Sequence, residues 1–413
     1  MSLRKKGQRF SAVICIGTLV AVPAYAKEKA DWVESINLDG FIAQGWQSPI
    51  EVDGALFLPS DAEAQSGFQR LRFGIQISAD INDKFSVFAE LAEEPNDFAS
   101  LTRFGISQDL AWIAYKLNDG NEIRLGNVIA YAGSMAFLKF SDGPVVQGNP
   151  LIGNSPVDMI TAEQGIWLTG GTPMGSGKLL WDATLSSPSF FADFSQDAGY
   201  NYKLNLTYEF DNGFGFGIGA FQTTGDAQCV ATVCTLADGG TVGSLIGLGD
   251  GDNYEFSTGG PDQRATHVGI IPGIDATIVQ ADAQYKNKRL MVHAQLGVAQ
   301  DEFSFLDRFG TAEFSEQDAE MRYASLTGQY TISDSLYLAA RYSISENESD
   351  AVASNDNVLD RIQFGGGYWF DQSILLKAEY VKQWEEANSG GLKTSGLGEA
   401  EWEGFSLEIS FQF

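Results

Sequence analysis

The stretch that most constrains this chain is Glu401 to Phe413, which reads EWEGFSLEISFQF. Side chains alternate between the two faces of a strand, so the apolar residues at every second position from Phe405 to Phe413 share one face. At the edge of a soluble sheet, such a face would invite aggregation. In a closed membrane barrel, the same strand pairs with the first strand and turns its apolar face to lipid. The stretch therefore favours a barrel over a soluble sandwich.

The opposite end of the chain resembles an export signal. Four basic residues lie within the first nine positions, an apolar run follows from Phe10 to Val22, and Ala24-Tyr25-Ala26 forms a small-residue cleavage site. This order is typical of a secretory signal peptide. The apolar run is shorter than the ~20 residues that a membrane-spanning helix needs. We expect residues 1–26 to be removed and residues 27–413 to form one domain.

Composition supports a single large barrel. No long apolar run follows residue 26, so the mature chain can span a membrane only as a closed barrel. The chain has 46 Gly, 28 Phe, 14 Tyr and 8 Trp, but only 11 Pro. Large barrels are single domains even at a length where two or three soluble domains are usual.

The chain is strongly acidic, with a formal net charge of −28, and all four basic residues of the predicted signal peptide are lost on cleavage. This balance disfavours nucleic acid as a partner. Cys229 and Cys234 remain after cleavage, and export through an oxidising compartment predicts a disulfide between them. A metal site would need more ligands nearby, so we expect neither a metal nor another cofactor.

The pattern between the two ends predicts an all-β fold, namely a transmembrane antiparallel β-barrel of about sixteen strands. Apolar and polar residues alternate within each segment, and short Asn-, Asp- and Gly-containing turns alternate with long polar connections. Short turns at one rim and long loops at the other are typical of outer-membrane barrels. The predicted strands are 36–47, 67–80, 84–92, 107–117, 121–130, 163–170, 178–186, 199–210, 213–224, 274–285, 289–300, 320–331, 335–345, 357–370, 373–385 and 401–413.

The polar face of these strands carries charges of both signs. Arg124 lies between the apolar positions Ile123 and Leu125, and comparable alternation surrounds the other basic residues. A water-filled lumen tolerates such charges, whereas a packed soluble core does not. The predicted pore-lining basic residues are Arg70, Arg72, Arg124, Arg341, Arg361 and Lys377.

The connection over 131–162 is the longest in the first third of the chain and contains several apolar residues. A loop of this length is usually functional or disordered. We expect it to fold back into the barrel mouth. The alternative is that it caps the outside or contacts a neighbouring subunit.

Together, the export signal, the alternating short and long connections, and the terminal Phe413 resemble the Gram-negative general porins over the whole mature chain. The resemblance implies a homotrimer in the outer membrane, in contact with its lipid and lipopolysaccharide. It also implies that loop 131–162 is the constriction, with Asp142 and Asp158 facing Arg70, Arg72 and Arg124. The loop lacks the dense acidic cluster of many porins.

The predicted function is a non-enzymatic channel for passive diffusion of small hydrophilic solutes and ions, with weak cation or near-neutral selectivity. One alternative is a channel specific for anions or sugars, to which Trp112, Trp167 or Trp369 would contribute. A second alternative is an outer-membrane hydrolase, although the chain has only two histidines and no G-x-S-x-G motif. A third is a secreted, soluble all-β binding protein.

Overall fold

The computed structural model describes residues 35–53, 67–93, 107–129, 162–187, 200–224, 270–271, 277–305, 315–349, 357–387 and 398–413. The predicted signal peptide, Asp142 and Asp158 of the predicted constriction loop, and Cys229 and Cys234 lie outside these residues. Within them, no helix is both long enough and apolar enough to cross a membrane.

The described residues form seventeen strands. Their bounds are β1 Ser35–Asp53, β2 Gly67–Asn82, β3 Phe85–Glu93, β4 Ser107–Asn118, β5 Asn121–Ile129, β6 Ala162–Met174, β7 Gly177–Ser187, β8 Tyr200–Phe210, β9 Phe214–Thr224, β10 Ile270–Ile271, β11 Thr277–Lys286, β12 Leu290–Phe305, β13 Ser315–Ser333, β14 Leu336–Ser349, β15 Asn357–Trp369, β16 Ile374–Ala387 and β17 Gly398–Gln412.

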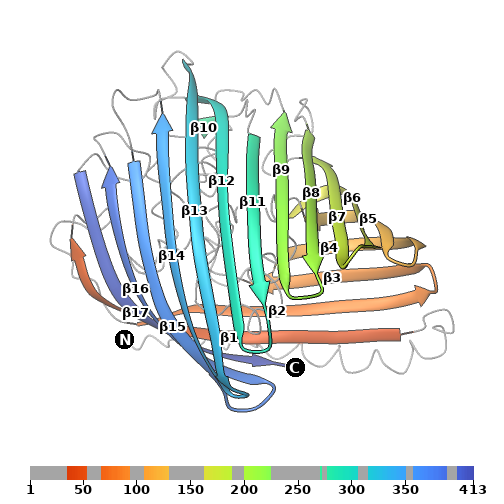
Figure 1. The fold of residues 1–413 in the computed structure, drawn as a ribbon, viewed down its shortest axis with the longest axis horizontal. Coiled ribbons are helices and arrows are strands. Elements are labelled where there is room, and N and C mark those ends of the chain that lie inside the picture. The colour runs from red at the N-terminus through yellow and green to blue at the C-terminus, as the bar shows by residue number, and fades with distance from the viewer. Residues whose placement is uncertain are drawn as a thin grey trace, which may run out of the picture.

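The strands close into a barrel, and each one pairs antiparallel with its neighbours around the ring (Figure 1). β9 pairs with β11, and β17 pairs with both β16 and β1, so sixteen strands complete the circle. The two-residue β10 pairs with β12 beyond the start of β11. The predicted fold class and number of strands are thereby confirmed.

Several strands are longer than the alternating pattern predicted, mainly toward the rim of the long connections. β12 continues to Phe305, and β13 begins at Ser315 rather than at 320. The residues added to β13 are polar apart from Ala319, so they carry no apolar periodicity. Backbone hydrogen bonds of the ladder do not require an apolar face, and pairing therefore continues past the end of the apolar pattern.

The seam between β1 and β17 has the predicted partners. Phe41 lies opposite Gln412, and the register continues to Asp53 opposite Glu401. Gly40 and Phe413 exchange two backbone hydrogen bonds, with N···O distances of 2.9 and 3.0 Å. The alternate residues from Phe405 to Phe413 are exposed on the outer surface, whereas Glu408 is buried. The terminal apolar face therefore points away from the barrel interior.

The seam also explains why a glycine occupies position 40. A Cβ on Gly40 would lie 2.5 Å from Cζ of Phe413 and 2.9 Å from the carbonyl oxygen of Gly74. We expect Gly40→Ala to displace the Phe413 ring and to lower barrel stability by about 1–3 kcal/mol, the usual cost of overpacking. Urea titration of the refolded protein in lipid vesicles measures this change.

Gly328→Ala provides the matched control, because a Cβ at that position has nothing within 4 Å. The explanation fails if both substitutions shift the urea midpoint equally.

Seven short connections of two to four residues join strands at one rim, and side-chain oxygens close several of them. Asn and Asp favour such turns because their side chains accept hydrogen bonds from backbone N–H groups a few residues ahead. Three turns use the same pair of bonds to the second and third residues ahead: Asn82 to Lys84 and Phe85, Asn287 to Arg289 and Leu290, and Asp371 to Ser373 and Ile374.

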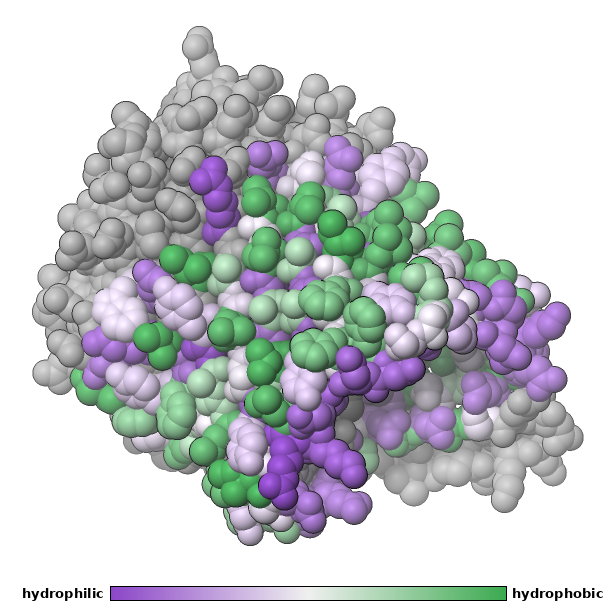
Figure 2. Space-filling model, in the orientation of Figure 1, coloured by the Kyte–Doolittle hydropathy of each residue, from purple (hydrophilic) through white to green (hydrophobic). Residues whose placement is uncertain are grey.

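The outer surface of the barrel is apolar between the rims. Figure 2 shows apolar residues spread over the middle of the visible face and hydrophilic residues mainly toward its edges, with groups at the bottom and at the right. Aromatic side chains pair on this surface close to the short turns, with ring centroids 4.6–5.9 Å apart. These pairs are Phe85–Tyr115, Tyr208–Phe210, Phe214–Tyr285, Tyr368–Phe370 and Phe411–Phe413. An apolar band bordered by aromatic residues is the surface that a membrane-spanning barrel presents to lipid.

Candidate functional site

The inner wall of the barrel is the candidate functional site, because it collects the polar side chains of the strands. The structure places three predicted wall residues there: Arg124 on β5, Arg341 on β14 and Lys377 on β16. Arg70 and Arg72 lie on β2 and Arg361 lies on β15, but their side chains are outside the described part of the structure.

On β16 and β17, the wall holds an ion pair that crosses between strands. Nζ of Lys377 lies 2.7 Å from Oε1 of Glu408, and the two side chains are only 2% and 0% exposed. Their backbones are directly opposite in the ladder. Next to them, Nε2 of Gln363 donates to Oε1 of Glu379 over 2.7 Å. A charge removed from water requires such a partner, so this pairing allows a charged wall to be buried.

A second buried pair lies on the wall of β7 and β8. Nζ of Lys203 is 2.5 Å from Oδ1 of Asp182, and both side chains are 1% exposed. The same oxygen accepts hydrogen bonds from Nε1 of Trp167 and Nδ2 of Asn205, at 3.3 and 3.4 Å. Asp182 thus joins residues from three neighbouring strands, β6, β7 and β8.

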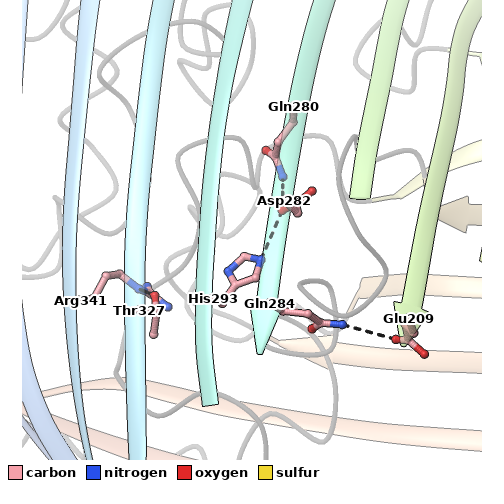
Figure 3. Close-up of polar contacts among 7 residues, drawn as sticks. All are labelled: Glu209, Gln280, Asp282, Gln284, His293, Thr327 and Arg341. Atoms are coloured by element: carbon pink, nitrogen blue, oxygen red, sulfur yellow. Dashed lines mark hydrogen bonds and ion pairs between the residues drawn. The ribbon is translucent and has the colours of Figure 1, made fainter. Parts of the chain in front are cut away.

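On β11 to β14, the wall consists of hydrogen-bonded polar side chains (Figure 3). His293 and Asp282 approach to 3.3 Å between Nε2 and Oδ1, and Gln280 donates to Asp282 over 3.1 Å. Nε of Arg341 donates to Oγ1 of Thr327 over 2.9 Å on the adjacent strand pair. This sector of the wall therefore contains acidic, basic and neutral polar side chains.

Arg124 has a different environment, because its guanidinium group lies in the corner formed by two tryptophan rings that meet edge to face. Its Cζ is 4.7 Å from the ring centroid of Trp112 and 4.2 Å from that of Trp167. Its Nε and Nη2 both contact Oε1 of Glu122, which lies two residues earlier on the same face of β5. Burial lowers the number of water contacts of this group, but the side chain keeps 23% of its surface exposed.

One sector of the inner wall is apolar, which simple alternation did not predict. Phe41, Tyr337 and Leu375 form a buried cluster, and Trp369 packs against it. These residues come from β1, β14, β16 and the end of β15. The inner face near the short turns is therefore partly apolar rather than uniformly polar.

Alternation along β8 and β12 places Lys203 and His293 on the inner face, but it does not identify their acidic partners. Asp182 and Asp282 also occupy inward positions of their strands, and this alternation was a usable signal. The pairing itself depends on the register between neighbouring strands, and the sequence of one strand does not determine that register. Among the described residues, no three His, Cys, Asp or Glu side chains are arranged to hold a metal ion.

No protein-family model matches the sequence, and no curated protein matches it. Solved structures do match. The outer membrane channel DcaP of Acinetobacter baumannii is 12% identical, with 92% of this chain and 97% of that chain covered and a TM-score of 0.56.

Two further structures match over a similar extent. The anion-selective porin from Comamonas acidovorans is 12% identical, with 92% and 99% of the chains covered and a TM-score of 0.54. Salmonella typhi OmpF, solved in complex with daunomycin, is 14% identical, with 92% and 97% covered and a TM-score of 0.53. The chain therefore has the fold of the outer-membrane porins.

Proposed function

We propose that this protein is an outer-membrane channel for passive diffusion of small hydrophilic solutes and ions. The observation that carries the proposal is the division of the closed barrel into an apolar outer surface and an inner wall with charges of both signs. Lipid requires the first, and a hydrated pore is compatible with the second. The porin fold of its structural neighbours supports the same function.

The charges of the inner wall support weak cation or near-neutral selectivity. Among the described residues, the buried acidic ones are Glu90, Asp182, Asp282, Glu379 and Glu408, and the buried basic ones are Lys203, Arg341 and Lys377. Several of these charges cancel in close pairs, which leaves a small acidic excess. Selectivity of a wide pore follows the net charge of its wall. A strong preference for either sign is therefore not expected.

Planar-bilayer recording of the purified protein tests this function. We expect stepwise insertion events, and in a KCl gradient a reversal potential that is small and has the sign of a cation preference. A folded barrel that gives no conductance steps would contradict the channel function. A large reversal potential of the anion-selective sign would contradict the proposed wall charge.

We propose further that the barrel assembles as a homotrimer that contacts lipid and lipopolysaccharide, and that cleavage after Ala26 precedes its insertion. The apolar outer band with aromatic pairs near the short turns supports membrane insertion. Chemical cross-linking in isolated outer membranes tests the trimer, and N-terminal sequencing of the membrane form tests the cleavage. A monomeric pattern on cross-linking would contradict the first of these.

A further inference from the structure

The turn between β11 and β12 differs in charge from the other short turns. It contains Lys288 and Arg289, and Lys286 precedes it at the end of β11. Each of the other six short connections is either neutral or carries one net negative charge. The whole chain has a formal net charge of −28, so a group of three cations runs against its composition. Residues 286–289 form what we call the basic turn.

The cations of the basic turn are exposed and have no partner within the described part of the chain. All four of its residues are exposed. None of the three cations forms a side-chain hydrogen bond or ion pair with any residue that the structure describes. By contrast, Lys116, beside the turn between β4 and β5, lies 3.0 Å from Asp119. Like charges this close repel one another, so they do not stabilise the hairpin, and a bound anion would offset the repulsion.

Asn287 holds the tip of the basic turn in one conformation. Its backbone N–H donates to the carbonyl oxygen of Leu290 over 2.8 Å. Its Oδ1 accepts hydrogen bonds from the backbone N–H groups of Arg289 and Leu290, at 2.8 and 2.9 Å. Its Nδ2 donates to the hydroxyl oxygen of Tyr285 over 3.1 Å. A tip that is already ordered loses little conformational entropy when it binds a partner.

The basic turn adjoins the lipid-facing surface of the barrel. Tyr285 packs against Phe214 with ring centroids 4.6 Å apart, and Phe214 is exposed on the outer surface. Such aromatic residues mark the boundary between membrane and water. Strands rise about 3.4 Å per residue, so Lys288 lies at most about 10 Å beyond Tyr285 along the chain. Long basic side chains lie along apolar surface and keep their charge in the polar headgroup region, so these cations can reach lipid phosphates.

We propose that the basic turn binds the phosphodiester group of an anionic phospholipid in the periplasmic leaflet, which the short turns of a membrane barrel face. The guanidinium of Arg289 can hold two phosphate oxygens through forked hydrogen bonds, and Lys286 and Lys288 add positive charge. A zwitterionic headgroup carries its own cation and is held more weakly. This inference rests on the membrane insertion that is part of the proposed function.

Native mass spectrometry of the folded protein in non-ionic detergent, titrated with phosphatidylglycerol or phosphatidylcholine, tests the proposal. Both lipids contain a phosphodiester, but only phosphatidylglycerol has a net negative charge. Each basic residue near an anionic lipid strengthens binding about fivefold, so the first phosphatidylglycerol should bind about 100-fold more tightly than phosphatidylcholine. The preference should shrink at high ammonium acetate concentration, because exposed charges are screened by salt.

Two triple variants separate the basic turn from the total charge of the protein. The first neutralises the basic turn and should reduce the preference to a few-fold: Lys286→Gln, Lys288→Gln and Arg289→Gln. The matched control removes three exposed lysines at other hairpins and should keep the preference: Lys84→Gln, Lys116→Gln and Lys178→Gln. Heat-modifiable migration on a gel verifies that both variants are folded.

Four results would overturn the proposal. Two are the absence of any preference for phosphatidylglycerol in the wild-type protein and an equal loss of preference in both triple variants. Displacement of phosphatidylglycerol by an equal concentration of inorganic phosphate would indicate a site for the free ion. Cosedimentation with purified peptidoglycan that only the first triple variant loses, without a lipid preference, would assign the turn to the cell wall.

Conductance in planar bilayers tests the channel function separately. A preference for phosphatidylglycerol in a barrel that gives no conductance would leave the lipid site in place and refute the channel. Normal conductance without a lipid preference would refute the lipid site alone.

Discussion

Deletion of Phe405–Phe413 is expected to abolish the folded barrel. This segment holds eight of the twelve residue pairs between β17 and β1, and seven of the fourteen between β17 and β16. Without it, β1 and β16 become open edges, and their unpaired N–H and C=O groups cannot be satisfied in lipid, at a cost of several kcal/mol for each group. The loss far exceeds the 5–15 kcal/mol of net stability typical of a folded protein.

Heat-modifiable migration of the refolded protein, together with its recovery in the outer-membrane fraction, measures this effect. The matched control is removal of nine residues from the connection between Thr224 and Ile270, which leaves every described strand pair in place. The truncated chain should give only the unfolded band, and the control should give the folded one. A folded, membrane-inserted truncation would show that the ring does not close through β17.

Substitution of Lys377 by Met is expected to be the most damaging single change in the wall. It removes the cation 2.7 Å from Glu408, whose side chain is completely buried. Breaking a buried ion pair from one side typically costs about 3–5 kcal/mol, because the remaining charge is left in a poorly hydrated place. The urea midpoint of the barrel in lipid vesicles should therefore fall markedly at neutral pH.

Two further variants test whether the unpaired charge of Glu408 causes this loss of stability. In Lys377→Met combined with Glu408→Leu, both charges are absent, so much of the stability should return. Lys116→Met removes the cation of an ion pair of 3.0 Å with Asp119, but that pair is largely exposed and should contribute little. Equal losses for Lys377→Met and Lys116→Met would show that burial of the Lys377–Glu408 pair is not the reason.

The architecture could be predicted from local patterns because a barrel repeats one simple rule. Alternation along each segment decides which face meets lipid, and turn residues such as Asn287 and Asp371 mark the hairpins. The same rule placed Arg124, Arg341 and Lys377 on the inner face. It did not predict the full length of β13, because polar residues extend that strand without adding to its apolar pattern.

The contacts of the wall could not be predicted in the same way. Whether Lys377 meets Glu408 depends on the register between β16 and β17, which are joined by a long connection rather than by a tight turn. The contacts of Arg124 require three strands to align, because Trp112 lies on β4 and Trp167 lies on β6. Register is a property of two paired strands, and the alternation within one strand is compatible with several alignments.

The hydrogen-bonded turns affect which mutations the barrel can tolerate during evolution. A slip of one residue in any hairpin would exchange its two faces and bring charged groups such as Lys203 into lipid. Side-chain oxygens of Asn82, Asn287 and Asp371 oppose such a slip at the rim of the short turns. Because alignment is secured there, insertions and deletions at the opposite rim leave it intact. The two rims therefore tolerate mutation very differently, and surface features facing the environment can diversify without cost to assembly.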